Sequence, residues 1–310
     1  MQHIYDTIII GGGPAGYTAA LYTARAGLDV LITEKMSIGG QMTLTGEIDN
    51  YPGFDGGIDG ITLGENMRSG AERFGAKTLY AQVNSVNFEG EIKLINTDDG
   101  QLRCRSVIIA TGASHKALGL PDEQALIGRG IHYCAHCDGR FYKDKTVAVV
   151  GGGNSAVSDA VYLSNLAKRV YLIHRRDSFR ADRVLFDALG KHDNIELVTY
   201  SAVVGLLSDR RLCGISVKNL QSGYISDLSC DGLFVNIGML PSSDIFRGAV
   251  DIDRNGYIVA GEDTKTNVSG VFVIGDVRTK PLRQIITAAA DGAVASHFVT
   301  EYLRDNPLKL

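Results

Sequence analysis

Short apolar runs alternate with Ala-rich segments along this chain, and the alternation predicts a parallel α/β fold. Residues 5–35 (YDTIIIGGGPAGYTAALYTARAGLDVLITEK) read as an apolar strand, a glycine-rich turn, an Ala-rich helix and a second strand. Residues 145–175 (KTVAVVGGGNSAVSDAVYLSNLAKRVYLIHR) repeat this order 140 positions later. Each stretch is a β-α-β unit, which implies parallel strands and a right-handed crossover. We therefore expect two Rossmann-like, three-layer domains.

The segments outside these two units predict further strands and helices. Between the units lie loops at 39–60, a helical stretch at about 61–75, and strand patterns at 79–88, 91–97 and 106–112. After the second unit come strand patterns at 195–207, 212–220, 228–238 and 270–277 and a helical pattern at 282–303. The tail forms no separate domain, so we expect residues 116–244 to be inserted into a domain built from 1–115 and 245–310.

Composition narrows the class of protein without naming a function. The 310 residues carry a net charge of −4, with 21% charged and 45% apolar residues, which are ordinary globular values. This balance gives no indication of nucleic acid or an anionic membrane surface as a partner. No apolar run approaches the roughly 20 residues that span a bilayer. The N-terminal residues lack a basic region before an apolar stretch, so we expect a cytoplasmic protein.

The first glycine-rich turn predicts a dinucleotide site. Gly11, Gly13 and Gly16 fit G-x-G-x-x-G, with Pro14 and Ala15 between them. In this motif the glycines allow a tight turn and close approach of backbone to a pyrophosphate, which lies at the helix N-terminus. Glu34 ends the next strand, where a carboxylate can accept hydrogen bonds from a ribose diol. A tight turn without a ligand is the alternative, but the preceding strand and following helix favour the dinucleotide.

The second glycine-rich turn predicts a site for a phosphorylated nicotinamide dinucleotide. Residues 151–156 fit G-x-G-x-x-A. The candidate ligand-binding residues of this turn are Gly151, Gly153, Asn154, Ser155 and Ala156. His174 stands where the first unit has its acid, and Arg175, Arg176 and Arg180 follow. Guanidinium groups bind a 2′-phosphate that a carboxylate would repel. We therefore expect NADPH rather than NADH here, with a solvated basic loop as the alternative.

Two dinucleotide sites in one chain indicate a flavin and a nicotinamide cofactor. The strand pattern ending at Gly275 and Asp276 is expected to share the first domain, so Asp276 is a candidate contact to the first ligand. The start of the C-terminal helix, at Arg283, Gln284 and Ile285, can present donors to the same ligand. The alternative for Asp276 is an ordinary turn residue.

The stretch HYCAHCDGRFY (132–142) holds a C-x-x-C whose chemistry has three interpretations. A structural zinc site needs about four ligands, and the sequence has no C-x-x-C or H-x-x-x-H pair outside this stretch to complete such a set. A structural disulfide in so small a ring constrains little chain. A redox dithiol fits better, because Asp138 follows Cys137 at once and can donate or accept the proton that a released thiolate needs. Packing is expected for the other cysteines, Cys104, Cys213 and Cys230.

His136 lies between the two cysteines and has two interpretations. A neighbouring imidazolium favours a thiolate, which would give this side chain a functional role. Alternatively, its ring points to solvent and contributes nothing to the dithiol.

These motifs, in this order, resemble the low-molecular-weight thioredoxin reductases over essentially the whole chain. The matching segments are GGGPAG, GGQ, NYPG, ATGA, CAHCDG, GGGNSA, HRRDSFRA, NIGMLPSS, VFVIGDV and RQIITAAADG. The resemblance implies a homodimer with bound FAD that takes electrons from NADPH and reduces thioredoxin or a thioredoxin-like redoxin. It implies an NADPH domain, carrying the dithiol, inserted in the FAD domain. It also implies that Cys137 lies nearer the flavin, that Cys134 attacks the partner, that Asp138 is the acid/base, and that Phe141 and Tyr142 belong to a docking loop.

The resemblance assigns further residues to each cofactor. For FAD these are the 11–16 turn, Glu34, Gly40, Gln41, Asn50, Val83, Ala110, Thr111, Gly112, Gly275, Asp276, Arg283, Gln284 and Ile285. For NADPH they are the 151–156 turn, His174, Arg175, Arg176 and Arg180.

Several residues depart from the pattern of this family. They are His132, His136, Arg140, Asn154, Ser158 and Met239. None removes a redox group or a phosphate ligand, although they bear on the partner surface and the nicotinamide pocket. Three other functions remain open from the sequence: the same dithiol chemistry with ferredoxin or a free flavin as donor, an NADPH:acceptor reductase with an incidental dithiol, and a non-catalytic nucleotide sensor.

Overall fold

The computed structural model describes residues 3–36, 38–44 and 47–308, and the chain contacts divide it into two compact units. Unit 1 comprises Met1–Thr43, Ile58–Ser114 and Leu240–Leu310, and unit 2 comprises Leu44–Gly57 and His115–Met239. The 44–57 segment, expected in the first domain, is thus grouped with the second unit. An ion pair of Asp49 with Arg140 contributes to that grouping.

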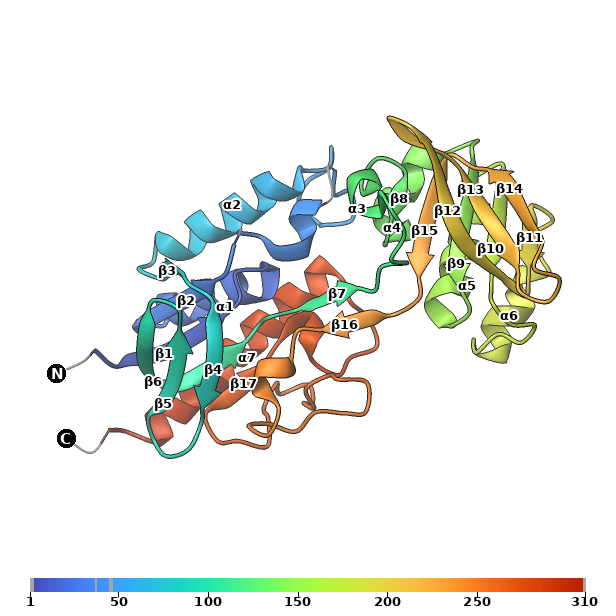
Figure 1. Ribbon diagram of the computed structural model, residues 1–310. Helices are drawn as coiled ribbons and strands as arrows, with labels where there is room; N and C mark the ends of the chain where they lie inside the picture. The colour runs from blue at the N-terminus through green and yellow to red at the C-terminus, as the bar shows by residue number, and fades with distance from the viewer. Residues whose placement is uncertain (1–2, 37, 45–46, 309–310) are drawn as a thin grey trace. The chain divides into compact units, whose positions relative to one another are not determined.

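Unit 1 is built on a mixed sheet in the order β3-β2-β1-β6-β5-β4, with β17 also paired to β6. Its strands are β1 (Tyr5–Ile10), β2 (Val30–Glu34), β3 (Lys77–Tyr80), β4 (Val83–Asn87), β5 (Lys93–Thr97), β6 (Gly100–Ile109) and β17 (Val271–Val273). The strands β1, β2, β3, β6 and β17 pair in parallel, while β4, β5 and β6 form an antiparallel extension. The helices are α1 (Pro14–Arg25), α2 (Gly60–Glu72) and α7 (Ile285–Asp305) (Figure 1).

Unit 2 has a parallel sheet in the order β11-β10-β9-β15-β8 and a separate antiparallel sheet, β12-β13-β14. Its strands are β8 (Ile131–His132), β9 (Thr146–Gly151), β10 (Arg169–Ile173), β11 (Ile195–Val198), β12 (Ser201–Asp209), β13 (Arg211–Asn219), β14 (Ile225–Ser229) and β15 (Gly232–Asn236). Its helices are α3 (Glu123–Leu126), α4 (Ala135–Asp138), α5 (Asn154–Ser164) and α6 (Arg183–Leu189).

Short elements complete the chain. The two connections between the units pair with each other as β7 (Ala113–His115) and β16 (Met239–Pro241). Single 3-10 turns are η1 (Gly40–Leu44), η2 (Gly139–Tyr142), η3 (Asp244–Phe246) and η4 (Gly275–Val277).

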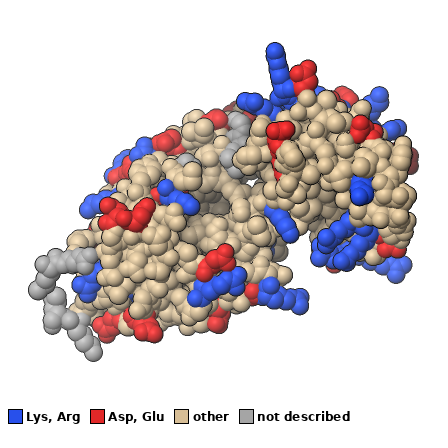
Figure 2. Space-filling view, viewed as in Figure 1, with Lys and Arg blue, Asp and Glu red and all other residues tan. Residues whose placement is uncertain are grey.

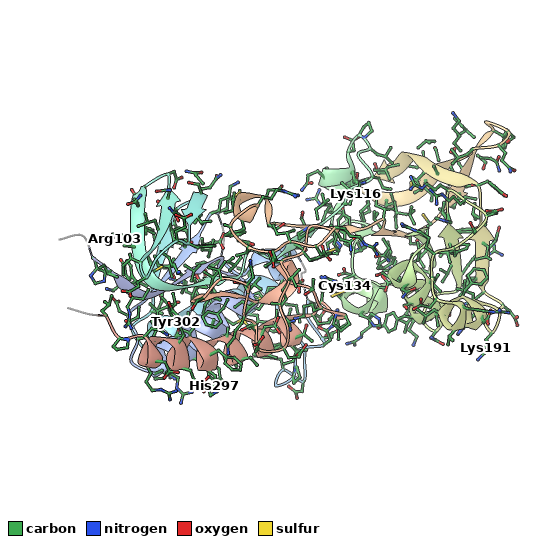
Figure 3. The ribbon with its side chains drawn as sticks, turned by 90° about the horizontal axis from the view of Figure 1, so that it is seen from below. Arg103, Lys116, Cys134, Lys191, His297 and Tyr302 are labelled. Atoms are coloured by element: carbon green, nitrogen blue, oxygen red, sulfur yellow. A yellow bond between two sulfur atoms is a disulfide. The ribbon has the colours of Figure 1, made fainter. Side chains whose placement is uncertain are left out.

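Each parallel sheet is buried on both faces, which explains why its strands are continuous apolar runs. In unit 1, Ile9 packs with α1 and α7 on one face of β1, while Ile8 and Ile10 belong to the core on the opposite face. Along α7, Tyr302 packs edge-on against Phe272 of β17, while His297 is exposed (Figure 3). The two predicted β-α-β units are confirmed as β1-α1-β2 and β9-α5-β10.

Four predicted strand patterns differ from the observed elements. The 79–88 run covers the end of β3 and all of β4, and the 228–238 run covers the end of β14 and all of β15. The 195–207 run is two strands, β11 and β12, because the chain turns at Tyr200, whose φ is 50°. The 270–277 run is a strand of three residues that passes directly into η4. Among the described residues, no helix has the length and apolar character needed to cross a membrane.

Candidate functional site

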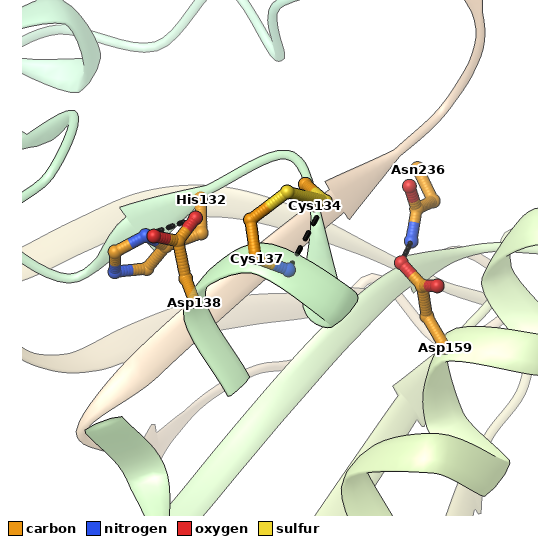
Figure 4. Close-up of a disulfide and its surroundings, with 6 residues drawn as sticks. All are labelled: His132, Cys134, Cys137, Asp138, Asp159 and Asn236. Carbon is orange, nitrogen blue, oxygen red and sulfur yellow. Dashed lines mark hydrogen bonds and ion pairs between the residues drawn. A yellow bond between two sulfur atoms is a disulfide. The ribbon is translucent and has the colours of Figure 1, made fainter. Parts of the chain in front are cut away.

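Cys134 and Cys137 form a disulfide at the end of β8 in unit 2 (Figure 4). Their Cα atoms are 5.3 Å apart, and the Cys137 backbone N–H donates to the Cys134 sulfur at 3.2 Å. Cys134 is the N-cap of the single-turn helix α4, which contains Cys137 and ends at Asp138. One turn of helix therefore brings the two sulfurs together and places the carboxylate directly after them.

Asp138 is held on its other side by a buried histidine. The Nδ1 atom of His132 lies 3.1 Å from Asp138 Oδ2, and its Nε2 atom lies 2.6 Å from the Tyr142 hydroxyl oxygen. Burial raises the pKa of Tyr142 to about 12, against the lowering effect of Arg211, so the hydroxyl keeps its proton at neutral pH. The candidate acid/base is thus one end of a hydrogen-bonded series of three side chains.

A second buried carboxylate fixes the start of α4. Asp159 on α5 accepts a hydrogen bond from Asn236 Nδ2 at 2.6 Å and another from the Ala135 backbone N–H. Burial raises the pKa of Asp159, although these two donors and the charge of His136 oppose the rise. The bonds connect the dithiol turn to the carboxyl end of β15 and to the helix that follows the second glycine turn.

His136 and the expected docking loop follow the dithiol closely in the sequence, and their side chains differ in exposure. His136 is exposed, and its ring packs at 4.2 Å from the ring of Tyr162. In the expected docking loop, Phe141 is 45% exposed but Tyr142 is only 1% exposed. Within this expected docking loop, Tyr142 does not present its side chain to solvent, because its ring fills the core beside His132 and Phe234.

The segment that carries the arginines, residues 174–182, is hydrogen-bonded to the second glycine turn. The Arg180 backbone N–H donates to the Gly152 carbonyl at 2.7 Å, and the Asn154 and Asp182 side chains and backbone exchange two hydrogen bonds at 2.8 Å. A Cβ on Gly152 would collide with the imidazole of His174. The turn and the 174–182 segment therefore form one structural piece, as a site that binds both a pyrophosphate and a 2′-phosphate requires.

The electrostatics of this segment fit a phosphate ligand. Arg175, Arg176 and Arg180 are exposed, and in the described part of the chain no carboxylate lies within ion-pair distance of them. Burial, joined by these three charges, lowers the pKa of His174 despite a hydrogen bond with the Ser178 backbone. Its buried Nε2 atom has no hydrogen-bond partner among the described residues. Figure 2 shows Lys and Arg side chains gathered on unit 2 around α5 and α6, next to this segment.

The first glycine turn in unit 1 has the geometry that the motif predicts. Gly11 has a φ of 112°, and a Cβ there would collide with the Ala110 carbonyl, while one on Gly16 would collide with Gly11. The Gly12 backbone N–H donates to Glu34 Oε2 at 2.7 Å. The turn thus leaves Gly13 with open space above it, where a pyrophosphate can approach the start of α1.

Asp276 supplies a second sign of a ligand site in unit 1. Its Oδ1 atom is buried and has no hydrogen-bond partner among the described residues, and burial raises the pKa of this carboxyl despite Lys280 and Arg283. An orphaned buried acceptor costs free energy unless a ligand donor satisfies it. The glycine cradle and this acceptor fit a dinucleotide with a polyhydroxyl chain.

The remaining residues expected at the first ligand lie in several elements. Arg283 stacks over Tyr257 at 4.1 Å and donates to the Asp276 carbonyl, while Gln284 and Thr287 form the capping box of α7, which begins at Ile285.

The other expected residues lie farther from α7 in the sequence. Thr111, between Ala110 and Gly112 after β6, donates to the Ser242 carbonyl at 2.7 Å. Val83 is buried at the start of β4, and Gly40 and Gln41 lie in η1. Asn50 lies in the 44–57 segment, which is grouped with unit 2.

Sequence reasoning missed the residues that support the site through buried contacts. His132 appeared only as a departure from the family pattern, and Asp159, Asn236 and Asp291 were not singled out. Asp159 and Asp291 each interrupt a small-residue or apolar helical pattern, and a charged residue at such a position is a signal that could have found them.

The chain matches the family described as pyridine nucleotide-disulphide oxidoreductase over residues 5–292, and it belongs to this family. It is therefore an oxidoreductase of the class that couples a pyridine nucleotide to a disulfide, and the resemblance to thioredoxin reductases is confirmed.

Three relatives show how close the similarity is. Thioredoxin reductase from Streptomyces coelicolor is 45% identical over 96% of this chain and 93% of that protein. The crystal structure of thioredoxin reductase from Streptococcus pyogenes superposes with a TM-score of 0.91 at 40% identity, covering 99% of this chain and all of that one, and it confirms the α/β class with two Rossmann-like domains. A bifunctional thioredoxin reductase/thioredoxin from Mycobacterium leprae is 42% identical over 98% of this chain and 67% of that protein.

Proposed function

We propose that this protein is an NADPH-dependent, FAD-containing thioredoxin reductase whose Cys134–Cys137 disulfide passes electrons to thioredoxin or a similar redoxin. The observation that carries the proposal is the disulfide on α4, in the same unit as the arginine-flanked nucleotide turn. The names of the relatives support the same activity.

The two cofactors are assigned to different units. FAD is held in unit 1 by the 11–16 turn, Glu34, Asp276 and the start of α7, together with the other residues of unit 1 that the sequence assigns to FAD. NADPH is held by the 151–156 turn and the 174–180 segment of unit 2. When bound, FAD supplies a carrier that takes a hydride from a nicotinamide and gives two electrons to a disulfide.

The side chains of unit 2 then carry out thiol–disulfide exchange. The reduced Cys134 attacks one sulfur of the disulfide of the redoxin, and Cys137 attacks the mixed disulfide to release the product. The two S–H bonds of the reduced enzyme and the S–S bond of the partner break, while one S–S bond in the enzyme and two S–H bonds in the partner form. Asp138 takes up and returns the proton that passes between sulfurs.

The test is Cys137→Ser, assayed with NADPH and a bacterial thioredoxin. The variant should retain bound FAD and NADPH oxidation with oxygen but lose thioredoxin reduction, by at least about a thousandfold if the exchange step is abolished. Cys213→Ser, an exposed free cysteine on β13, is the matched control and should behave as the unsubstituted protein. Retained thioredoxin reduction in Cys137→Ser would contradict the proposal.

The electron donor is tested separately. Anaerobic NADPH should bleach the flavin absorbance of the intact protein. Bleaching by reduced ferredoxin or a free reduced flavin, with no response to NADPH, would favour the alternative donor.

We also assign the protein to the cytoplasm, as a homodimer. The reduced Cys104, Cys213 and Cys230 are in keeping with a reducing compartment. The resemblance to the family supports the dimer, which light scattering of the purified protein would measure.

A further inference from the structure

The hydrogen-bonded series Tyr142–His132–Asp138 is almost wholly shielded from solvent. The side chains of His132 and Asp138 are 8% and 13% exposed, and Tyr142 is 1% exposed. Figure 4 shows the Asp138 carboxyl group turned toward the imidazole of His132, beside the helical turn that carries the disulfide. A buried polar contact of this kind holds one geometry, since either partner alone would be left unsatisfied.

The positions of the hydrogens follow from the groups around Tyr142. The guanidinium of Arg211 faces the Tyr142 hydroxyl, and a guanidinium has only donors. The hydroxyl hydrogen is therefore free to point at His132 Nε2, which accepts it. With Nε2 as the acceptor, the neutral ring carries its hydrogen on Nδ1 and donates it to Asp138.

The imidazole of His132 has no room to turn away from Asp138. Its ring packs on Tyr142 at 5.2 Å and on Phe234 at 5.4 Å. Backbone pairing of β8 with β15 sets His132 opposite Phe234. The ionisable groups that face this histidine and its tyrosine partner are Asp138 on α4, Tyr142 on η2, Arg211 on β13, Asp231 before β15, and Lys145 over the tyrosine ring.

We propose that His132 is a positioning residue for dithiol exchange: its Nδ1–H holds the Asp138 carboxylate and reduces the negative charge that this carboxylate presents to the dithiol. The proposal rests on the proposed function, because it assumes that the dithiol reacts as a thiolate.

The physical effect has a definite sign. A bare carboxylate beside a thiol opposes formation of the thiolate, whereas a carboxylate that receives a hydrogen bond opposes it less. Only the thiolate is a nucleophile, so loss of the Nδ1–H donor should move thiol reactivity to higher pH. This role of His132 does not change the thiol–disulfide exchange described under the proposed function. The proton leaves a cysteine sulfur, passes through Asp138 and ends on a sulfur of the partner.

The experiment measures alkylation of the pre-reduced holoprotein by iodoacetamide from pH 5 to 9, with Cys134 read by mass spectrometry. In His132→Gln the side-chain amide lies near the position of Nε2, on the side of Tyr142, but no donor lies at the position of Nδ1. We expect its pH profile to lie about one unit higher, with alkylation about tenfold slower at pH 7. His132→Asn is the matched control, because its amide N–H falls near Nδ1. It should stay within about twofold of the unsubstituted protein, since the hydrogen bond to Asp138 is kept.

A double-mutant cycle tests whether His132 acts through Asp138. In the Asp138→Asn background, His132→Gln should change the alkylation profile by less than about twofold, because the carboxylate it would act on is gone. Tyr142→Phe removes the other hydrogen bond without touching Asp138 and should give a smaller shift in the same direction.

The proposal is overturned by superimposable pH profiles for the unsubstituted protein and His132→Gln, or by an equal shift in the Asp138→Asn background. The assay uses neither NADPH nor thioredoxin, so its outcome is separate from the proposed function, whose failure would appear as loss of thioredoxin reduction in the unsubstituted protein.

Discussion

Asp291 of α7 receives two hydrogen bonds from the guanidinium of Arg278, at 2.8 and 2.9 Å, in the interior of unit 1. The same carboxylate accepts a hydrogen bond from the Gly275 backbone N–H at 2.9 Å and pairs with Lys280 at 2.8 Å. The turn that carries Asp276 is therefore anchored to α7 by a buried network of charges.

Removing the charge of Asp291 should destabilise the protein strongly. Asp291→Asn removes the buried counter-ion of Arg278 and Lys280 and leaves Arg278 the solvent-exposed Glu262 at 3.8 Å. Loss of such a buried partner costs about 3–5 kcal/mol in comparable pairs. The measurement is the urea unfolding midpoint. Asp305→Asn, which breaks an exposed pair with Arg304, is the control and should change little. Equal midpoints for the two variants would contradict this prediction.

The same network gives unit 1 a defined acid sensitivity. Burial raises the pKa of Asp291, but its bonds with Arg278 and Lys280 outweigh burial and leave this pKa below the usual value. A carboxyl with a depressed pKa in the folded state stabilises above the pKa of the unfolded state, about 3.9. That stability is lost as the pH falls through the lower folded value, and Asp291→Asn should show a smaller loss over this range.

Asp276 is expected to determine flavin retention. Its buried, unpartnered Oδ1 atom offers an acceptor that Asp276→Ala removes and Asp276→Asn keeps. We expect Asp276→Ala to weaken FAD binding by about tenfold or more, from the loss of one hydrogen bond to a charged group. The flavin absorbance that remains after dialysis measures the effect. Asp244→Ala, in an exposed turn, is the control, and equal flavin loss from both would count against the assignment.

The arginines after β10 are expected to select NADPH over NADH. Arg175→Ala and Arg176→Ala should each raise the KM for NADPH by about tenfold, as expected for loss of a charged hydrogen bond, and leave the KM for NADH nearly unchanged. Steady-state kinetics with both nucleotides measures the ratio. Arg247→Ala in unit 1 is the charge-matched control. A parallel rise for both nucleotides would mean that these side chains do not contact the 2′-phosphate.

His115 is expected to make unit 2 less stable at mildly acidic pH. Burial lowers the pKa of His115 to about 4, and its ring stacks on Tyr133 at 4.8 Å. Between this value and the ordinary pKa of about 6.5, the unfolded chain binds a proton that the folded state does not. Stability should therefore fall as the pH drops from about 6.5 to about 4.

His115→Phe keeps the aromatic stack and removes the titration. Its unfolding midpoint should decline less between pH 7 and 5 than that of the unsubstituted protein. His297→Gln, at an exposed position on α7, should follow the unsubstituted protein. If His115→Phe and His297→Gln decline alike, His115 is not the group responsible.

Much of the site could be predicted because its parts are local in sequence. The C-x-x-C forms its disulfide within one turn of helix, and each glycine turn lies between a strand and the helix that follows it. Asp138 is adjacent to Cys137, so its proximity needed no tertiary information. His174 occupies the position that the β-α-β repeat assigns to the ribose-binding residue of the first unit, and the arginines follow it directly in the sequence.

Other features arise from contacts between segments far apart in the chain. Asp159 meets Asn236 across 77 positions, and Asp276 owes its anchoring to Asp291 through Gly275. The sequence predicts that Tyr142 belongs to a docking loop, but it does not reveal that the ring of Tyr142 packs in the core against Phe234 of β15.

The sequence by itself determined the α/β class, the two nucleotide turns and the redox dithiol, because periodicity and short motifs encode backbone geometry over a few residues. Only the tertiary structure decided how the carboxylate beside the dithiol is held. That depends on burial and on which side chains share one interior, and these follow from the packing of strands and helices that the sequence separates.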